Sequence, residues 1–219
     1  MAVAYALFWS GGKDSTFALH QARESRLDVR YLVNIYEGST GRVRFHGVRA
    51  GLVAAQAATL GIPLIQRHTH PDPFESVFEQ VLDELRGRGV EGVLFGNVHL
   101  RDVRAWYETR TMRRGFVHRE PLWGRPPGKV VRDFLAAGYR AVVTSVDLAR
   151  GQAWWVGREL DRGLVEAVEA SGADPCGEFG EYHTFVFDGP GFQHPVRFRP
   201  GESVERDGHR FVDLLEDGA

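Results

Sequence analysis

A short glycine-containing segment near the N-terminus constrains this chain more than any other feature. Residues 10–15 read Ser-Gly-Gly-Lys-Asp-Ser; the apolar residues 5–9 precede them, and residues 16–22 follow with a helical pattern. A buried strand, a glycine turn and a helix start in succession favour anion binding, because bare N–H groups and the helix dipole converge there. This segment, called the glycine loop below, therefore predicts a phosphate site after the first strand of an α/β sheet.

The residues inside the glycine loop distinguish two kinds of phosphate site. The P-loop of GTPases and kinases needs a glycine five residues before Gly12 and a Gly-Lys-Ser/Thr ending. Leu7 occupies the position of that glycine, and Asp14 interrupts the Gly-Lys-Ser/Thr ending. The segment therefore does not match the P-loop of GTPases and kinases. A carboxylate beside a phosphate is repulsive unless a cation lies between them. Asp14 therefore suggests Mg²⁺ that bridges to a polyphosphate.

The glycine loop resembles the pyrophosphate loop, Ser-Gly-Gly-x-Asp-Ser, of the N-type ATP pyrophosphatases. The resemblance implies the adenine nucleotide alpha hydrolase type of fold and an enzyme that uses ATP to adenylate a carboxylate or carbonyl oxygen. Lys13 is within reach to offset phosphate charge. A plain serine and glycine turn is the alternative. The residues that the resemblance assigns to the phosphates and Mg²⁺ are Ser10, Gly11, Gly12, Asp14 and Ser15.

Composition limits the class of protein. The 219 residues are 43% hydrophobic and 26% charged, which fits one large domain or one domain with an appendix. The net charge of -2 gives no basic excess that would favour nucleic acid as the main partner. Cys176 is the single cysteine, which excludes an internal disulfide. Without a bilayer-length apolar stretch or a signal-like N-terminus, we expect a soluble, cytoplasmic protein.

Strand-like and helix-like segments alternate from the N-terminus to about residue 147. After residues 5–9, predicted strands cover residues 28–35, 64–67, 92–98 and 140–147, and helices cover residues 73–86, 100–114 and 127–137, among others. Asp72 is expected to cap the first of these three helices. The alternation predicts a doubly wound, Rossmann-like parallel sheet of five strands.

After about residue 147 the regular alternation of strand and helix ends, and the sequence predicts a smaller C-terminal α+β part. We place a nucleotide-binding domain at residues 1–124 and a smaller substrate domain at residues 125–219. A boundary nearer Val146 fits the sequence equally well.

Polar residues follow several predicted strands, at the edge where open parallel sheets bind ligands. We predict nucleotide contacts there, although a polar strand ending and a solvated arginine-rich helix face are the alternatives. His68 and His70 have a metal-like spacing, but no third ligand lies close in sequence, and we interpret them as polar residues that border the nucleotide cleft. The predicted nucleotide contacts at these strand ends are Asn34, Gly96, Asn97 and Arg104.

A second candidate site is the acidic loop, residues 177–181, which reads Gly-Glu-Phe-Gly-Glu. Its two carboxylates belong to Glu178 and Glu181, and its two glycines oppose a helix. Carboxylates held close together share a cation, raise one another's pKa or bind an ammonium ion. An acidic surface turn is the alternative interpretation.

Several motifs together resemble the diphthine-ammonia ligase family. They are Ser-Gly-Gly-Lys-Asp-Ser, Gly-Ile-Pro-Leu, Gly-Asn-Val before an arginine-rich helix, Pro-Leu-Trp, and Cys-Gly-Glu-x-Gly-Glu-Tyr-x-Thr followed by Phe-Asp-Gly-Pro. The resemblance covers residues 4–191 and implies that ATP adenylates the diphthine carboxylate of elongation factor 2, after which ammonia displaces AMP. It further implies that Glu178 and Glu181 face the acceptor site, where one binds ammonium or takes its proton.

Some residues depart from the eukaryotic and archaeal pattern of that family, namely Asn97, Phe179 and His183. The stretch His46-Gly47-x-Arg49 is closer to bacterial members. Bacteria have no diphthamide, so in a bacterial chain the acceptor is another carboxylate.

We therefore expect an amide ligase that uses ATP and Mg²⁺, forms AMP and pyrophosphate, and transfers ammonia or an amine. The acceptor carboxylate, a protein diphthine or a small molecule, stays open, as does the oligomeric state, a homo-oligomer included. The alternative is a non-catalytic ATP- or AMP-binding regulatory module on the same fold. A tRNA-modifying enzyme is disfavoured by the near-neutral charge and by the single cysteine.

Overall fold

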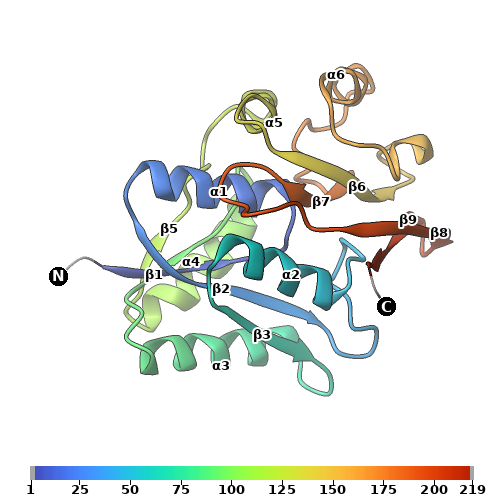
Figure 1. The fold of residues 1–219 in the computed structure, drawn as a ribbon. Helices are drawn as coiled ribbons and strands as arrows, with labels where there is room; N and C mark the ends of the chain where they lie inside the picture. Colours follow the sequence, from blue (N-terminus) through green and yellow to red (C-terminus); the bar gives the residue numbers. More distant parts are fainter. Residues whose placement is uncertain (1–2, 218–219) are drawn as a thin grey trace.

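The computed structural model describes residues 3–217, which form two β-sheets with helices packed on them (Figure 1). The first sheet is parallel throughout and has the strand order β3-β2-β1-β4-β5. The chain starts at the central strand and winds outward in both directions, which confirms the predicted doubly wound α/β fold. Its strands are β1 (Ala4–Phe8), β2 (Asp28–Glu37), β3 (Leu64–Thr69), β4 (Gly92–Leu94) and β5 (Val117–Arg119).

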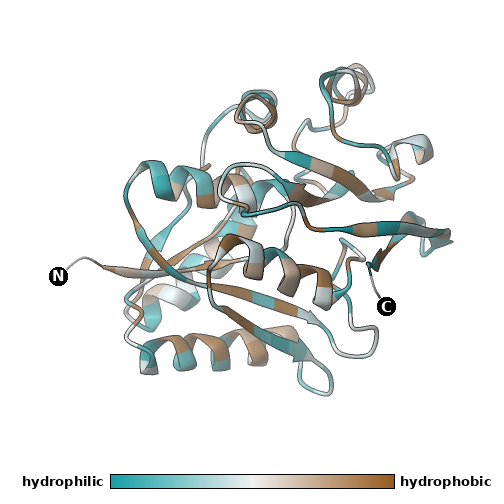
Figure 2. Cartoon of the chain, viewed as in Figure 1, coloured by the Kyte–Doolittle hydropathy of each residue, from teal (hydrophilic) through white to brown (hydrophobic). Residues whose placement is uncertain are grey.

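Helices cover both faces of this sheet, and alternate side chains of β1 pack toward each face. Leu7 belongs to the hydrophobic core that includes α1 and α2, whereas Ala6 belongs to the core that includes α3. Figure 2 shows hydrophobic and hydrophilic residues alternating along α3, as expected of a helix with one buried face. The four helices are α1 (Lys13–Glu24), α2 (Ala50–Leu60), α3 (Phe74–Gly87) and α4 (Arg101–Arg113).

The second sheet is antiparallel and has the order β7-β6-β9-β8. It shares one hydrophobic core with the α1 and α2 face of the first sheet; within that core, Phe17 of α1 meets Phe134 of α5 edge-on, with 6.3 Å between ring centroids. The division at residues 124 and 125 into two domains stays a prediction. The elements of this half are α5 (Pro127–Ala136), β6 (Arg140–Asp147), η1 (Ala153–Trp155), α6 (Arg162–Ala170), β7 (Tyr182–Asp188), β8 (Phe198–Arg206) and β9 (His209–Glu216).

Three expectations about individual elements are wrong. Residues 140–147 form β6 of the antiparallel sheet, and the fifth parallel strand is β5, whose three residues are too few to show a period. The fourth strand ends at Leu94 rather than at residue 98. Asp72 does not cap α3, because Pro73 occupies the N-cap position and the Asp72 carbonyl instead accepts a hydrogen bond from the backbone of His70. Among residues 3–217, no helix combines the length and the apolar character that crossing a bilayer requires.

Candidate active site

The glycine loop connects β1 to the first turn of α1, as its sequence predicts. Gly11 has a φ of +81°, in the left-handed region that side chains disfavour. Gly12 is the N-cap of α1, and a Cβ atom placed there would lie 2.7 Å from Cε1 of His46. The first glycine is therefore required by backbone conformation and the second by close packing.

The glycine loop is held from the second sheet by hydrogen bonds to β7. The Gly11 carbonyl accepts from the backbone N–H of Val186 and from Nε2 of Gln56, both at 2.9 Å. The backbone N–H of Lys13 donates to Oγ1 of Thr184 at 3.0 Å. Residues far apart in sequence thus fix the position of the helix start, whose dipole favours an anion.

Two serine hydroxyls of the glycine loop lie next to each other. Oγ of Ser15 donates to the Gly12 carbonyl at 3.1 Å and lies 3.3 Å from Oγ of Ser10. Oγ of Ser10 in turn accepts from the backbone N–H of Gly12 at 3.3 Å. Both serines also line a cavity, so their hydroxyls can reach an anion at the start of α1.

Lys13 and Asp14 form a buried ion pair. The Lys13 side chain is 4% exposed, and its Nζ donates to Oδ2 of Asp14 at 2.9 Å and to the Cys176 carbonyl. Burial is the largest influence and opposes the charged amine, but Asp14, Tyr182 and Cys176 together outweigh it, and the pKa of Lys13 is raised above its usual value. Oδ1 of Asp14 is buried and has no hydrogen-bond partner within residues 3–217. This oxygen is therefore free for a cation.

A cavity of about 270 Å³ lies at the carboxyl ends of β1, β2 and β4. Aromatic side chains from the first sheet and from α3 and α4 form part of its wall, and the acidic loop closes it from the other half of the chain. The predicted site residues that line it are Ser10, Asp14, Ser15, Asn34, Gly96, Asn97 and Glu178. The predicted residues that do not line it are Gly11, Gly12, Lys13, Arg104 and Glu181.

Asn34 and Gly96 bring neighbouring strand ends close to the glycine loop. Nδ2 of Asn34 donates to the Trp9 carbonyl at 2.9 Å, and its Oδ1 accepts from Gln66. At Gly96, a Cβ atom would lie 2.8 Å from the carbonyl carbon of Asp14, so only glycine permits this approach. Both residues shape the cavity through packing as well as through their polar groups.

Glu178 is the member of the acidic loop that faces the cavity. Its Oε2 accepts hydrogen bonds from the backbone N–H groups of Val98 at 3.0 Å and His99 at 3.5 Å. Burial and the nearby charge of Asp14 raise the pKa of the Glu178 carboxyl to about 7. A carboxyl group that titrates near neutrality inside a cavity suits general acid-base chemistry.

Glu181, the second carboxylate of the acidic loop, does not line the cavity. Its side chain is 5% exposed, and Oε1 accepts from the backbone N–H of Asp174 at 3.0 Å. Asp174 in turn accepts from the backbone of Cys176 and contacts Nε2 of His99 at 2.6 Å. The expectation that both glutamates face one site is therefore not met, and a catalytic role of Glu181 stays a prediction.

Two histidines that sequence analysis did not assign to the site also line the cavity. The rings of His46 and His183 lie 4.6 Å apart, and Nδ1 of His46 lies 3.0 Å from the Thr184 carbonyl. Burial lowers the pKa of His46 to about 4 and the pKa of His183 well below its usual value. No local spacing signals this pair, because the two residues belong to different halves of the chain.

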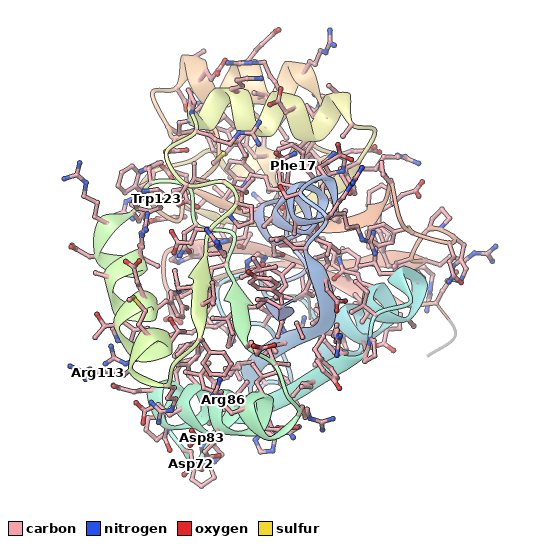
Figure 3. The ribbon with its side chains drawn as sticks, turned by 90° about the vertical axis from the view of Figure 1, so that its left-hand side faces the viewer. Phe17, Asp72, Asp83, Arg86, Arg113 and Trp123 are labelled. Carbon is pink, nitrogen blue, oxygen red and sulfur yellow. The ribbon has the colours of Figure 1, made fainter. Side chains whose placement is uncertain are left out.

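Arg104 and the histidines after β3 lie outside this cavity. Arg104 pairs with Glu108 at 3.3 Å and stacks on Trp123, which lies beside α4 in Figure 3. Its contact with phosphates stays a prediction. His68 and His70 do not line the cavity, but His70 lines a neighbouring pocket that shares Ile35 and Phe74 with it, and their place at the border of a nucleotide cleft stays a prediction. Arg113 points away from the molecule at the end of α4 (Figure 3), as expected of a solvated arginine.

Comparison with known proteins shows similarity along most of the chain. Family models of the diphthamide synthase N-terminal and C-terminal domains match residues 3–117 and 126–213. The chain is 22% identical to the diphthine-ammonia ligase of Mus musculus and 23% identical to that of Homo sapiens; each alignment covers 94% of this chain and 86% of the relative. It is 24% identical to the diphthine-ammonia ligase of Schizosaccharomyces pombe over 90% of this chain, which spans 36% of that longer protein.

Proposed function

The chain belongs to the diphthamide synthase family, and we propose that it is an ATP-dependent ligase that joins ammonia or an amine to a carboxylate. In this proposal ATP is cleaved to AMP and pyrophosphate. One observation carries it: the glycine loop and the carboxyl group of Glu178, with its pKa of about 7, line the same cavity. The relatives named diphthine-ammonia ligase support an enzyme with this type of chemistry.

ATP would bind with its phosphates at the glycine loop. The hydroxyls of Ser10 and Ser15 are the side-chain donors available to them, and the dipole at the start of α1 favours an anion there. The Lys13 ammonium, which pairs with Asp14 and donates to the Cys176 carbonyl, would offset phosphate charge from behind the cavity wall. The aromatic part of the wall, which includes Phe74 and Tyr107, offers an apolar surface for the base.

Mg²⁺ fits the oxygen atoms that are present. Oδ1 of Asp14 is buried without a partner within residues 3–217, and carboxylate oxygens are preferred ligands of this ion. No group of three His, Cys, Asp or Glu side chains in the described chain suits a metal. Most ligands of the ion would therefore come from the phosphates and water, and the bound ion would neutralise phosphate charge.

The proposed reaction has two steps. An oxygen of the acceptor carboxylate attacks the α-phosphorus of ATP, the bond to the β-phosphate breaks, and pyrophosphate leaves. Ammonia then attacks the acyl carbon, AMP leaves with the bridging oxygen, and an amide remains. Glu178 takes the proton that the attacking nitrogen loses, while Glu181 supports the acidic loop through the backbone of Asp174.

The experiment combines the protein with ATP, Mg²⁺, ¹⁵N-ammonium and elongation factor 2 that carries diphthine, and a parallel set replaces the factor by small carboxylic acids. Formation of AMP, pyrophosphate and a ¹⁵N-amide in equal amounts is the expected result. Formation of ADP and phosphate would contradict adenylation. ATP binding without turnover on any acceptor would favour the regulatory module instead.

A further inference from the structure

Glu120, which follows β5, is a buried carboxylate next to the cavity. Its side chain is 1% exposed. Its Oε1 accepts from Nδ2 of Asn97 at 2.7 Å and lies 3.1 Å from Nε2 of His118, while Oε2 lies 3.7 Å from Nε of Arg104. The carboxylate is thus held through Oε1, whereas Oε2 is buried and has no hydrogen-bond partner within residues 3–217.

These contacts determine how the Asn97 amide is turned. A carboxylate only accepts hydrogen bonds, so the NH₂ end of the amide faces Glu120. Oδ1 of Asn97 accepts no hydrogen bond within residues 3–217 and is not among the buried side-chain atoms that lack a partner. Since Asn97 lines the cavity, its amide oxygen is open to it.

A second oxygen without a hydrogen-bond partner within residues 3–217 belongs to Asp14, which lines the same cavity. Gly96, the residue before Asn97, packs directly against the backbone of Asp14. The oxygen of Asp14 is Oδ1, which is buried. A carboxylate oxygen and an amide oxygen, both of the type that Mg²⁺ prefers, therefore belong to residues that line the same cavity.

We propose that Glu120 is a positioning residue that holds the Asn97 amide with its oxygen toward the cavity, where this oxygen and Oδ1 of Asp14 receive the cation that accompanies ATP. The proposal rests on the proposed function, because the cation arrives with the nucleotide. It gives β5 a role that its three residues do not suggest. Arg104, which stacks on Trp123, then acts on the site through Glu120.

The test is calorimetric titration with ATP in the presence of Mn²⁺ and, separately, with metal-free ATP in EDTA. The ratio of the two affinities measures how much the cation tightens binding. We expect Glu120→Leu to reduce this ratio by about 10-fold and to leave metal-free binding within about twofold of the wild type. Asn97→Ala should reduce this ratio by the same factor, and the double variant Asn97→Ala/Glu120→Leu should reduce it no further.

Glu79→Gln is the matched control, because Glu79 pairs with Arg114 rather than with Arg104 or Asn97; it should leave the ratio unchanged. An unchanged ratio in folded Glu120→Leu overturns the proposal, as does an equal loss of metal-free binding, which would mean a purely structural role. If Glu120→Leu does not fold, an unchanged ratio in Asn97→Ala overturns it. A wild-type protein that binds no ATP overturns the proposed function and this inference together. The other results bear on the role of Glu120 alone and leave the proposed function standing.

Discussion

The backbone N–H of Lys13 donates a hydrogen bond of 3.0 Å to the hydroxyl of Thr184, which lies 171 residues further along the chain. Lys13 begins the helix that follows the glycine loop, and Thr184 belongs to β7 of the second sheet. The Thr184 carbonyl also lies 3.0 Å from Nδ1 of His46. One residue of the second half thus contacts both the glycine loop and His46 of the cavity wall, so the two halves of the chain build one site.

Loss of the Thr184 hydroxyl should destabilise the protein. Thr184→Val keeps the shape of the side chain but leaves the Lys13 N–H buried without an acceptor, which costs about 1–3 kcal/mol of the free energy of unfolding. Thr184→Ser retains the hydroxyl and should lie close to the wild type. Urea-induced unfolding measures both, and equal midpoints for the wild type and the valine variant would contradict the assignment.

Glu178 should make both activity and stability depend on pH near neutrality. As the base, Glu178 is active when ionised. Turnover should therefore rise as the pH increases through about 7, the pKa of the Glu178 carboxyl in the folded protein. Glu178→Gln should lower turnover by roughly 10²–10⁴-fold. A pH-rate profile of AMP formation measures this, and a variant that retains the wild-type profile would exclude Glu178 as the base.

The same group links folding to pH. Its pKa of about 7 in the folded protein exceeds the ordinary value of 4.5, so the folded state binds this proton more tightly than the unfolded state does. The contribution of Glu178 to the free energy of unfolding should therefore decrease as the pH rises from about 4.5 to about 7. Glu178→Gln should remove this decrease, which denaturation series across that pH range can detect.

Removing one partner of the buried ion pair between Lys13 and Asp14 should lower the free energy of unfolding more than replacing both partners does. Lys13→Met leaves the Asp14 carboxylate without its cation, and we expect a loss of about 3 kcal/mol or more. The double variant Lys13→Met/Asp14→Asn should recover part of that stability. Lys129→Met, which breaks the exposed pair with Asp133, is the control and should cost less than about 1 kcal/mol. Thermal and chemical unfolding would show whether the double variant is instead the least stable.

His46 should make the protein sensitive to acid. Its pKa of about 4 in the folded protein is below the ordinary 6.5, so the unfolded state binds this proton more tightly, and stability should fall as the pH drops from about 6.5 to about 4. His46→Gln keeps a donor for the Thr184 carbonyl and should reduce this loss. The exposed His68→Gln serves as the control. Equal acid sensitivity of His46→Gln and the wild type would contradict this expectation.

Sequence reasoning succeeded where the pattern is local. The glycine loop, the apolar stripe of α3 and the first four parallel strands depend on residues close together in the sequence, so their patterns are visible in the chain. The apolar residues 140–147 were assigned to the wrong sheet because consecutive residues of β6 are buried, a pattern that is also typical of a strand in a parallel sheet.

The parts that sequence reasoning missed depend on contacts between distant residues. His46 and His183 meet only when β7 packs over the glycine loop. Glu181 looks equivalent to Glu178 in sequence, yet it turns inward to the Asp174 backbone, and no neighbouring residue signals this. Three residues of β5 likewise carry no period, although they bring Glu120 to Asn97.

The most direct test of the central claim is isothermal titration of the purified protein and of Asp14→Ala with ATP and Mg²⁺. The account predicts one ATP per chain in the wild type and at least about tenfold weaker binding in the variant, because the glycine loop and Asp14 form the nucleotide site. Circular dichroism would check that the variant is folded. Equal affinity in both proteins, or no binding in the wild type, would contradict the claim that this cavity is an ATP site.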